Sequence, residues 1–374
     1  MAVAEDSSEK YDQDFFLDLA AKGKDAWNAW RRDPANKDVR VTFAGIDFSR
    51  APLDTIDFSG FEFGHWADFS GYVWRGVAWQ FGGDWERGYG MGIRFDPKAF
   101  RPGRASFIGA TFGPSAFFVN ASFGEEAFFD GAIFDAHPSF FGATFGDGAS
   151  FTKTTFGSWT SFCLATFGAG ASFDGTTFGH YVTFNGTAFG YLASFNGAVF
   201  KGGVTFIAGP KPNEEKDDPE NPLKQRHRRL WKHRGSGPDR FQSISFANAR
   251  FSEEAELPGA GNFSGRTFED VVDFSNARFF KPPIFHNVTN VVQIDFSGTR
   301  IGFALPGERP WTSDSKIPIR LRALRKIAEE TKNHDLERDL YIEECKAERG
   351  VYWRQLLDEL KRAPGIQKET RRYR

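Results

Sequence analysis

Phenylalanine recurs along this chain at a spacing that few folds can accommodate. Between positions 107 and 206 the intervals alternate between 5 and 6, so that two interleaved series each return at every eleventh position. A fixed internal period is typical of a repeat fold, in which each unit packs only on its neighbours. The first series is Phe107, Phe118, Phe129, Phe140, Phe151, Phe162, Phe173, Phe184, Phe195 and Phe206, and the second is Phe112, Phe123, Phe134, Phe145, Phe156, Phe167, Phe178, Phe189 and Phe200.

Small residues accompany these phenylalanines. Ala stands two residues before Phe at 12 of the 19 positions, and Pro, Thr or Val stands at the others. Residues i and i−2 of an extended chain point to the same side, so each unit directs one small and one large apolar residue inward. Gly follows seven members of the second series, and we expect these glycines to supply the positive φ of sharp corners. The unit is predicted to be a short strand followed by a corner.

The same period has a helical alternative, because an 11-residue repeat also produces right-handed supercoiled helices. Frequent Gly argues against it, since each Gly costs a helix interior about 1 kcal/mol. Two successive units together supply four inward Phe, which suits a four-sided coil. We therefore predict that residues two units apart, such as Phe107 and Phe129, stack in columns along a solenoid.

The segment 105–113, Ala-Ser-Phe-Ile-Gly-Ala-Thr-Phe-Gly, resembles the pentapeptide-repeat family in a degenerate, Phe-rich form. The resemblance covers about residues 41–302 and implies an all-β solenoid, a right-handed quadrilateral β-helix. This sequence departs from the family pattern in two ways. Phe replaces the usual Leu, and every second unit carries a sixth residue, which we expect to bulge at two opposite corners.

Helices are predicted at both ends of the repeats. Residues 13–32 have helical apolar spacing before Asp33-Pro34, and they resemble the Trp-rich helix that precedes the repeats in relatives. We expect a capping helix there, with a binding helix as the alternative. From Ile317 three helices are predicted: one before a turn at 333–335, one from the N-cap Asp335 to Gly350, and one around Trp353. The domains are thus a tail and capping helix at 1–40, repeats at 41–315 and a C-terminal helical segment at 316–374.

Two stretches interrupt the repeats, a short loop at 86–94 and a charged loop at 208–240. The longer loop has an acidic first half and a basic second half, and long loops are usually functional or disordered. Its basic side chains could bind a phosphate-rich partner, with a self-neutralised solvated loop as the alternative. The candidates are Arg226, Arg228, Arg229 and Trp231.

Composition places this chain among soluble proteins of a reducing compartment. The net charge is −2, and the two cysteines are far apart in sequence. The N-terminus lacks the pattern of a signal peptide, and no apolar stretch is long enough to span a membrane. We expect a cytoplasmic location, with attachment at the inner face of the membrane as the alternative.

Catalytic motifs are missing from the sequence. The seven histidines have no zinc spacing, and no phosphate-binding loop or nucleophile elbow is present. We expect no enzyme activity, cofactor, metal or small-molecule substrate. His137, Trp159 and Tyr181, each two units from the next, are predicted to form an outward column near the outward Phe117, Phe128 and Phe141. We expect this column to contact a protein, with an exposed surface that has no partner as the alternative.

Three hypotheses for function follow. The first is a non-catalytic scaffold that binds an unidentified protein through its rod and its C-terminal helices, where Arg325 and Trp353 are candidate contacts. The second is a DNA mimic that binds a type II topoisomerase, as some pentapeptide-repeat proteins do. Between 105 and 207, however, the sequence has six acidic and two basic residues. The net charge of −4 is low for the dense negative stripe that DNA mimicry needs. The third is a peripheral membrane protein held by basic helices. Nucleic acid is not an expected partner.

Overall fold

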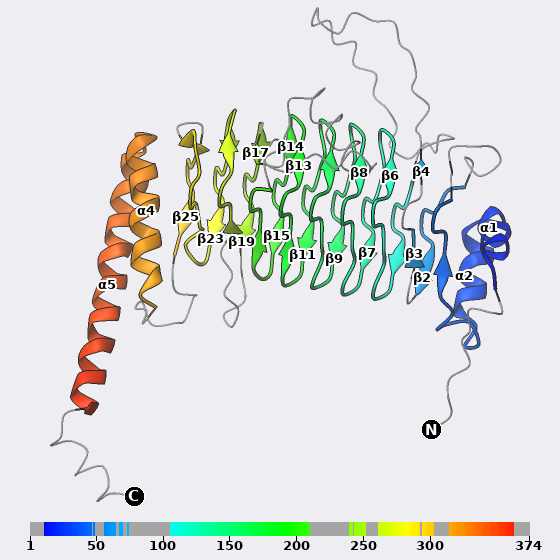
Figure 1. Cartoon of the computed structure of the whole chain (residues 1–374), viewed down its shortest axis with the longest axis horizontal. Coiled ribbons are helices and arrows are strands. Elements are labelled where there is room, and N and C mark those ends of the chain that lie inside the picture. The colour runs from blue at the N-terminus through cyan, green and yellow to red at the C-terminus, as the bar shows by residue number, and fades with distance from the viewer. Residues whose placement is uncertain are drawn as a thin grey trace, which may run out of the picture.

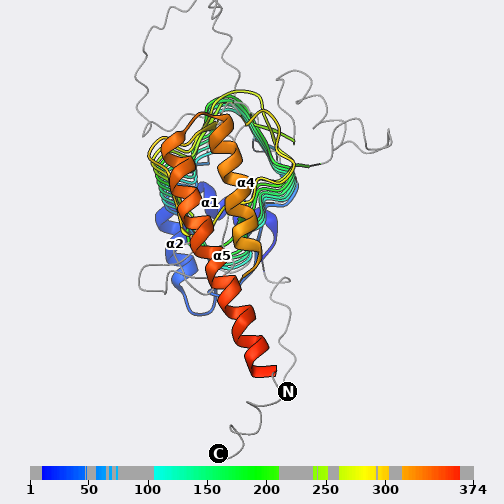
Figure 2. The ribbon, with the colours of Figure 1, turned by 90° about the vertical axis from the view of Figure 1, so that its left-hand side faces the viewer.

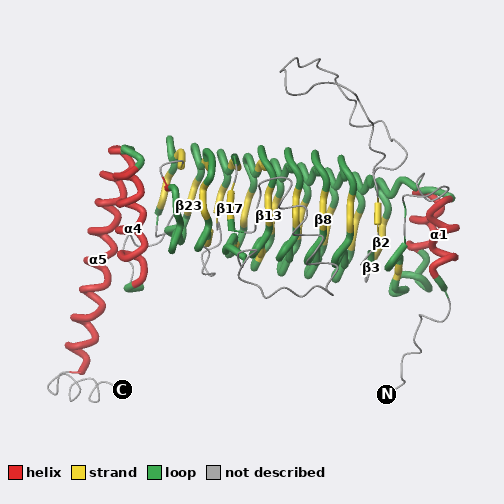
Figure 3. Tube along the Cα trace, turned by 45° about the horizontal axis from the view of Figure 1, so that its top comes forward, coloured by secondary structure: helices red, strands yellow, loops and turns green. Residues whose placement is uncertain are grey.

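Short parallel strands stack along one axis, and helices lie at both ends of the stack (Figures 1 and 3). The computed structural model describes residues 11–46, 48, 56–64, 67–69, 73–74, 105–209, 239–241, 243–251, 261–291, 294–302 and 314–362. Adjacent strands pair in parallel, and in the regular part each residue pairs with the one two units further on, as Thr155 does with Thr177. This is a solenoid-like repeat architecture.

The longest sheet runs the length of this rod. Its nine strands are β2 (Glu62–Gly64), β5 (Thr111–Phe112), β7 (Ile133–Phe134), β9 (Thr155–Phe156), β11 (Thr177–Phe178), β15 (Val199–Phe200), β19 (Arg250–Phe251), β23 (Arg278–Phe279) and β25 (Arg300–Ile301). A five-stranded sheet contains β4 (Val73–Trp74), β6 (Ser122–Phe123), β8 (Thr144–Phe145), β10 (Thr166–Phe167) and β13 (Ala188–Phe189).

Four smaller sheets complete the stack. One joins β14 (Ala193–Ser194), β18 (Ile244–Ser245), β22 (Val272–Asp273) and β24 (Ile294–Asp295). Another joins β12 (Val182–Thr183), β16 (Val204–Thr205) and β20 (Gly261–Asn262). The remaining two are the pairs β1 (Val41–Thr42) with β3 (Ala67–Asp68), and β17 (Arg240–Phe241) with β21 (Thr267–Phe268).

Stacked phenylalanine rings form the core, as the spacing predicts. The ring centroids of Phe107 and Phe129 lie 4.8 Å apart at an interplanar angle of 10°. Rings of adjacent columns meet edge to face, as between Phe107 and Phe118 at 86°. Offset stacks and edge-to-face pairs are the preferred aromatic geometries, so each ring packs favourably on its face and on its edge.

Inward threonines supply hydrogen bonds that alanine at the same position cannot. The Thr154 hydroxyl donates to the Phe129 carbonyl at 2.6 Å, and Thr176 donates to Phe151 at the same distance. Both threonines are fully buried. These bonds satisfy the hydroxyl groups, which would otherwise be costly in an apolar core.

The role predicted for the glycines after the second Phe series is wrong. Gly157 and Gly179 do not have positive φ; a Cβ on Gly157 would lie 2.6 Å from the Asp135 backbone of the neighbouring repeat. These glycines are therefore required by close approach between successive turns of the chain. Positive φ falls elsewhere in each corner, at Gly109 two residues after Phe107, and at Ser115 three residues after Phe112.

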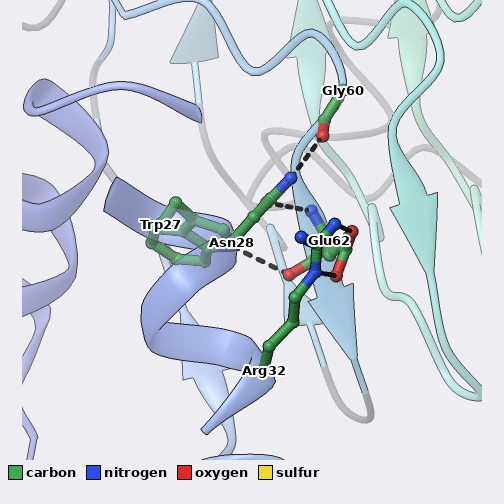
Figure 4. A network of polar contacts seen from close by, with 5 residues as sticks. All are labelled: Trp27, Asn28, Arg32, Gly60 and Glu62. Atoms are coloured by element: carbon green, nitrogen blue, oxygen red, sulfur yellow. Dashed lines mark hydrogen bonds and ion pairs between the residues drawn. The ribbon is translucent and has the colours of Figure 1, made fainter. Parts of the chain in front are cut away.

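Two short helices cover the N-terminal end, where one was predicted. Helices α1 (Gln13–Ala21) and α2 (Lys24–Arg32) are separated by Gly23, whose φ of 86° stops the first and begins the second. Figure 4 shows how α2 completes the free edge of β2. The Asn28 amide donates to the Gly60 carbonyl at 3.0 Å and accepts from the Glu62 N–H at 2.9 Å, while Trp27 Nε1 donates to the Glu62 carbonyl at 2.9 Å. Asn28 and Trp27 thus bind backbone groups of Gly60 and Glu62 at the edge of the sheet that no further strand pairs with.

The sequence spacing predicts Phe246 as the first inward residue after the long insertion. The structure places an inward residue earlier, because strand β17 already directs Phe241 into the core. Phe246 then stacks on Phe195 at 5.0 Å, so the columns continue across the insertion. The sequence spacing also predicts inward positions on both sides of this regular part, at Leu53, Trp79, Trp85, Phe95, Phe100 and Leu257. These positions, and the loop predicted at 86–94, lie outside the described residues.

Between residues 314 and 362, two helices follow the rod where three were predicted. Helices α4 (Lys316–Glu330) and α5 (His334–Arg362) lie across its end, and α5 continues beyond α4 (Figures 1 and 2). Gly350 does not end a helix, because it lies buried inside α5. The predicted N-cap Asp335 is also wrong: the Asn333 side chain accepts from the Leu336 N–H at 3.1 Å.

Candidate interaction surfaces

The predicted aromatic column forms on one corner of the rod. The rings of Trp159 and Tyr181 stack at 4.2 Å with an interplanar angle of 19°, and His137 lies 6.2 Å from Trp159 at 7°. Trp159 is 54% exposed and Tyr181 is 42% exposed. The structure therefore brings these three residues together on a solvent-exposed corner.

All three residues occupy a strained backbone position. Their φ angles are 64°, 65° and 58° for His137, Trp159 and Tyr181. Glycine holds the equivalent corner position at Gly148 and Gly170, and a bulky residue there costs about 1 kcal/mol or more. Bulky aromatic side chains are thus present where Gly would be more stable.

The phenylalanines expected beside this column differ in exposure. Phe141 is exposed, whereas Phe117 and Phe128 are only half-buried and pair through their backbones with Ser139 and Ser150 of the next repeat. Only Phe141 among them offers a large exposed apolar side chain.

The distal half of α5 carries the second surface. Helix α5 has 29 residues against 15 in α4, so its last turns extend past the helix it packs on (Figure 1). Trp353, Leu357 and Leu360 are 53%, 43% and 46% exposed. Their spacing of i, i+4 and i+7 places them on one face of the helix. We call these three residues the distal stripe.

Arg325 lies apart from Trp353, within the contact between the two helices. Its Nε donates to Glu344 Oε2 at 3.0 Å, and its guanidinium lies 5.5 Å from the centre of the Tyr341 ring. Arg322 binds the other oxygen of Glu344 at 2.7 Å. Because Glu344 is buried, these bonds hold α4 on α5, and Arg325 acts there as a structural residue. The candidates Arg226, Arg228, Arg229 and Trp231 lie outside the described residues.

Acidic side chains of the rod accept hydrogen bonds from neighbouring repeats. Asp130 accepts from the Ser150 hydroxyl at 2.7 Å, Asp147 accepts from the Ala169 N–H at 2.8 Å, and Asp174 binds the Ser194 hydroxyl. Burial raises the pKa of Asp130, against the opposing effect of its hydrogen bonds. These carboxylates therefore connect successive repeats.

Sequence reasoning missed three outward arginines in the longest sheet: Arg250, Arg278 and Arg300. Each stands one residue before an inward Phe or Ile. The interval from Arg250 to Arg278 is longer than that from Arg278 to Arg300, which hides their common register. A second missed group is the buried pair of Asp239 and Arg266. Alignment of every residue to its inward Phe would have found both groups.

A scan against protein-family models found no match, and a search of curated proteins found none. In the part of the chain that the structure describes, no helix is long and apolar enough to cross a membrane. The same part has no cluster of His, Cys, Asp or Glu that could hold a metal ion.

Proposed function

We propose that this chain is a non-catalytic scaffold of the pentapeptide-repeat type, which binds a partner protein through the distal stripe. The four phenylalanine columns and the two-unit register of the strands support a quadrilateral β-helix, for which we propose the right-handed form of that family. The proposed compartment is the cytoplasm. In this account the rod is a rigid spacer, and the distal part of α5 is the docking element.

One observation carries the proposal. An apolar face lies on the part of α5 that extends past α4, the helix on which α5 packs. It consists of Trp353, Leu357 and Leu360. Anchors at i, i+4 and i+7 match the mode in which an amphipathic helix lies in the apolar groove of another protein. Large apolar side chains, Trp above all, contribute most of the binding energy in such contacts.

Point substitutions test this proposal better than deletion of the helices. α4 and α5 cover the end of the rod, and their removal would expose apolar residues of its last repeat. We expect Trp353→Glu with Leu357→Glu to abolish capture of one discrete partner by crosslinked pull-down. The matched control, Trp159→Gly with Tyr181→Gly, removes the aromatic column at positions where Gly fits, and should retain that partner. If the control variant loses the partner and the stripe variant retains it, the partner binds the rod and not the distal stripe.

Membrane attachment is the second candidate, because Lys361 and Arg362 follow the apolar face of α5. A helix of this kind could lie in the headgroup region of an anionic bilayer. Flotation with phosphatidylserine vesicles separates the two candidates: co-flotation that Trp353→Glu abolishes would support the membrane. DNA mimicry has less support, since the carboxylates of Asp130, Asp147 and Asp174 are held by hydrogen bonds between repeats.

A further inference from the structure

One side of the rod carries uncharged residues over four successive turns of the chain. In each turn three outward residues alternate with buried ones, as His137, Ser139 and Phe141 do with Pro138 and Phe140. Backbone pairing joins each turn to the next, so the outward residues form three columns. The columns are His137, Trp159, Tyr181 and Gly203; Ser139, Ser161, Thr183 and Thr205; and Phe141, Cys163, Asn185 and Ile207. We call these twelve residues the neutral face.

Charged residues border the neutral face, and none of its twelve members is Asp, Glu, Lys or Arg. The exposed Asp135 and Lys201 stand beside its first column, each two residues before a member of it. The central column continues through Phe117 to Asp68 at one end, and to Asn262 at the other. Protein interfaces have the same arrangement, in which an aromatic centre that is poor in charge is surrounded by a polar rim.

Aromatic side chains supply much of the exposed area of the neutral face. Trp159, Tyr181 and Phe141 are between 42% and 54% exposed, and Leu164 beside them is 38% exposed. At about 200 Å² for each aromatic residue, the three present on the order of 300 Å². A typical stable interface buries about 800 Å² on each partner, and most of the other nine residues are half-buried. The face therefore suits a contact that forms at high protein concentration and dissociates on dilution.

The three columns complement a second copy of themselves. When two rods lie side by side, related by a two-fold axis along their length, the first column of each meets the third column of the other. Trp159 and Tyr181 of one copy then pack on Phe141 and Leu164 of the second copy. The central hydroxyl columns meet each other, and a hydroxyl group both donates and accepts hydrogen bonds. Because the face has no like charges, this symmetric contact has no charge repulsion to overcome.

We propose that the neutral face joins two copies of this chain into a side-by-side dimer with parallel rods. This inference goes beyond the proposed docking function, because it uses a different surface and does not require the distal stripe. It also gives a reason for the strained corner of the rod. Burial of the large aromatic side chains of Trp159 and Tyr181 in the dimer offsets the strain of their backbone.

Sedimentation equilibrium of the full chain, over about a hundredfold range of concentration, tests the dimer. We expect reversible association of two copies. Trp159→Gly with Tyr181→Gly should weaken this association by about tenfold or more, because buried Trp and Tyr contribute most of the energy of such contacts. The matched control is Tyr191→Ala with Leu192→Gly, which removes exposed side chains from another corner, where Gly170 holds the position equivalent to Leu192. It should leave the association unchanged.

A pair of charge variants tests the arrangement of the two copies. Ser161→Asp places like charges where the two central columns meet, and Asp68 in the same column shows that this backbone position accommodates an acidic residue. Neither Ser161→Asp nor Ser161→Lys should associate with itself, whereas an equimolar mixture of the two should form a heterodimer.

Four results would overturn the proposal: a monomer at every concentration, equal loss of association in the aromatic and control variants, no heterodimer in the charge-variant mixture, or Trp159-dependent flotation with phosphatidylcholine vesicles in place of association. The variant Trp353→Glu with Leu357→Glu leaves the neutral face intact, so it should still form the dimer. Association through the neutral face and pull-down through the distal stripe can therefore fail independently.

Discussion

The guanidinium of Arg266 donates to the carbonyl of Phe206 at 2.7 Å, across the long insertion between them. It also donates to Thr187 at 3.0 Å and Phe184 at 3.2 Å, and lies 4.6 Å from the Phe241 ring. Arg266 is fully buried, which lowers its pKa to about 9, while Asp239 acts in the opposite sense. This residue ties the repeat before the insertion to the repeats after it.

The buried pair gives a prediction by substitution. Arg266 and Asp239 stand at the inward positions that Ala or Thr fills elsewhere, such as Ala165 and Thr187. Arg266→Thr alone should lower the free energy of unfolding by about 1–3 kcal/mol or more. It removes the donor to the carbonyls of Phe206 and Thr187, and it leaves the buried Asp239 with only the half-exposed Arg240, 3.8 Å away. The double variant Asp239→Ala with Arg266→Thr should return to within about 1 kcal/mol of the wild type. Urea unfolding measures both, and a double variant as unstable as the single would contradict the pairing.

Substitution by Ala should destabilise the protein to different degrees at two kinds of glycine. Gly157→Ala places a methyl group 2.6 Å from the backbone of the neighbouring repeat, so we expect a loss of about 1–3 kcal/mol or more. Gly197 has a φ of 65° and nothing within 4 Å of the added Cβ, so Gly197→Ala should cost only about 1–2 kcal/mol. Paired urea midpoints test the difference. Equal losses would mean that close approach does not require Gly157.

The N-terminal cap should depend on Asn28 more than on Arg32. Asn28→Ala leaves partly buried backbone groups of Gly60 and Glu62 without their partners, which costs about 1–3 kcal/mol. Arg32→Ala removes an ion pair to Glu62 whose arginine side chain is 68% exposed and screened by solvent, so we expect a smaller loss of stability than for Asn28→Ala. Thermal unfolding of the two variants ranks them, and the reverse order would contradict the described cap.

Asp130 should make stability depend on pH. Its pKa is raised above the usual 3.8, mainly by burial, so the folded protein takes up a proton before the unfolded chain does as the pH falls. The Asp130 contribution therefore increases stability as the pH drops through the interval between those two pKa values. Asp130→Asn should be at least as stable as the wild type at pH 7, and this advantage should shrink on acidification. A Tm difference that does not change with pH would contradict the assignment.

The sequence predicts the parts of this fold that repeat locally. The Phe columns follow from spacing alone, since each ring meets the ring two units further along the chain. The roles of Gly157 and Arg266 depend instead on contacts between successive turns of the chain, and an insertion hides the register of Arg266. Gly350 looked like a helix end, but a cost of about 1 kcal/mol is small within the long, packed α5.

The candidate surfaces follow the same rule as the fold: those that depend on the local repeat can be predicted from the sequence, and the others cannot. The aromatic column follows from the same period, whereas the distal stripe depends on α5 running past α4, which no local pattern specifies. The three outward arginines of the longest sheet are not evident from the sequence, because the intervals from Arg250 to Arg278 and from Arg278 to Arg300 are unequal, although the strands are adjacent in the sheet.

The most direct test of the central claim places a photo-crosslinker on the distal stripe in living cells. With p-benzoyl-phenylalanine in place of Leu360, the scaffold account predicts one discrete protein adduct, which Trp353→Glu abolishes. The same probe in place of the exposed Arg338, in the proximal half of α5, should give none. An adduct that forms equally at both positions, or that survives Trp353→Glu, would contradict docking through the distal stripe.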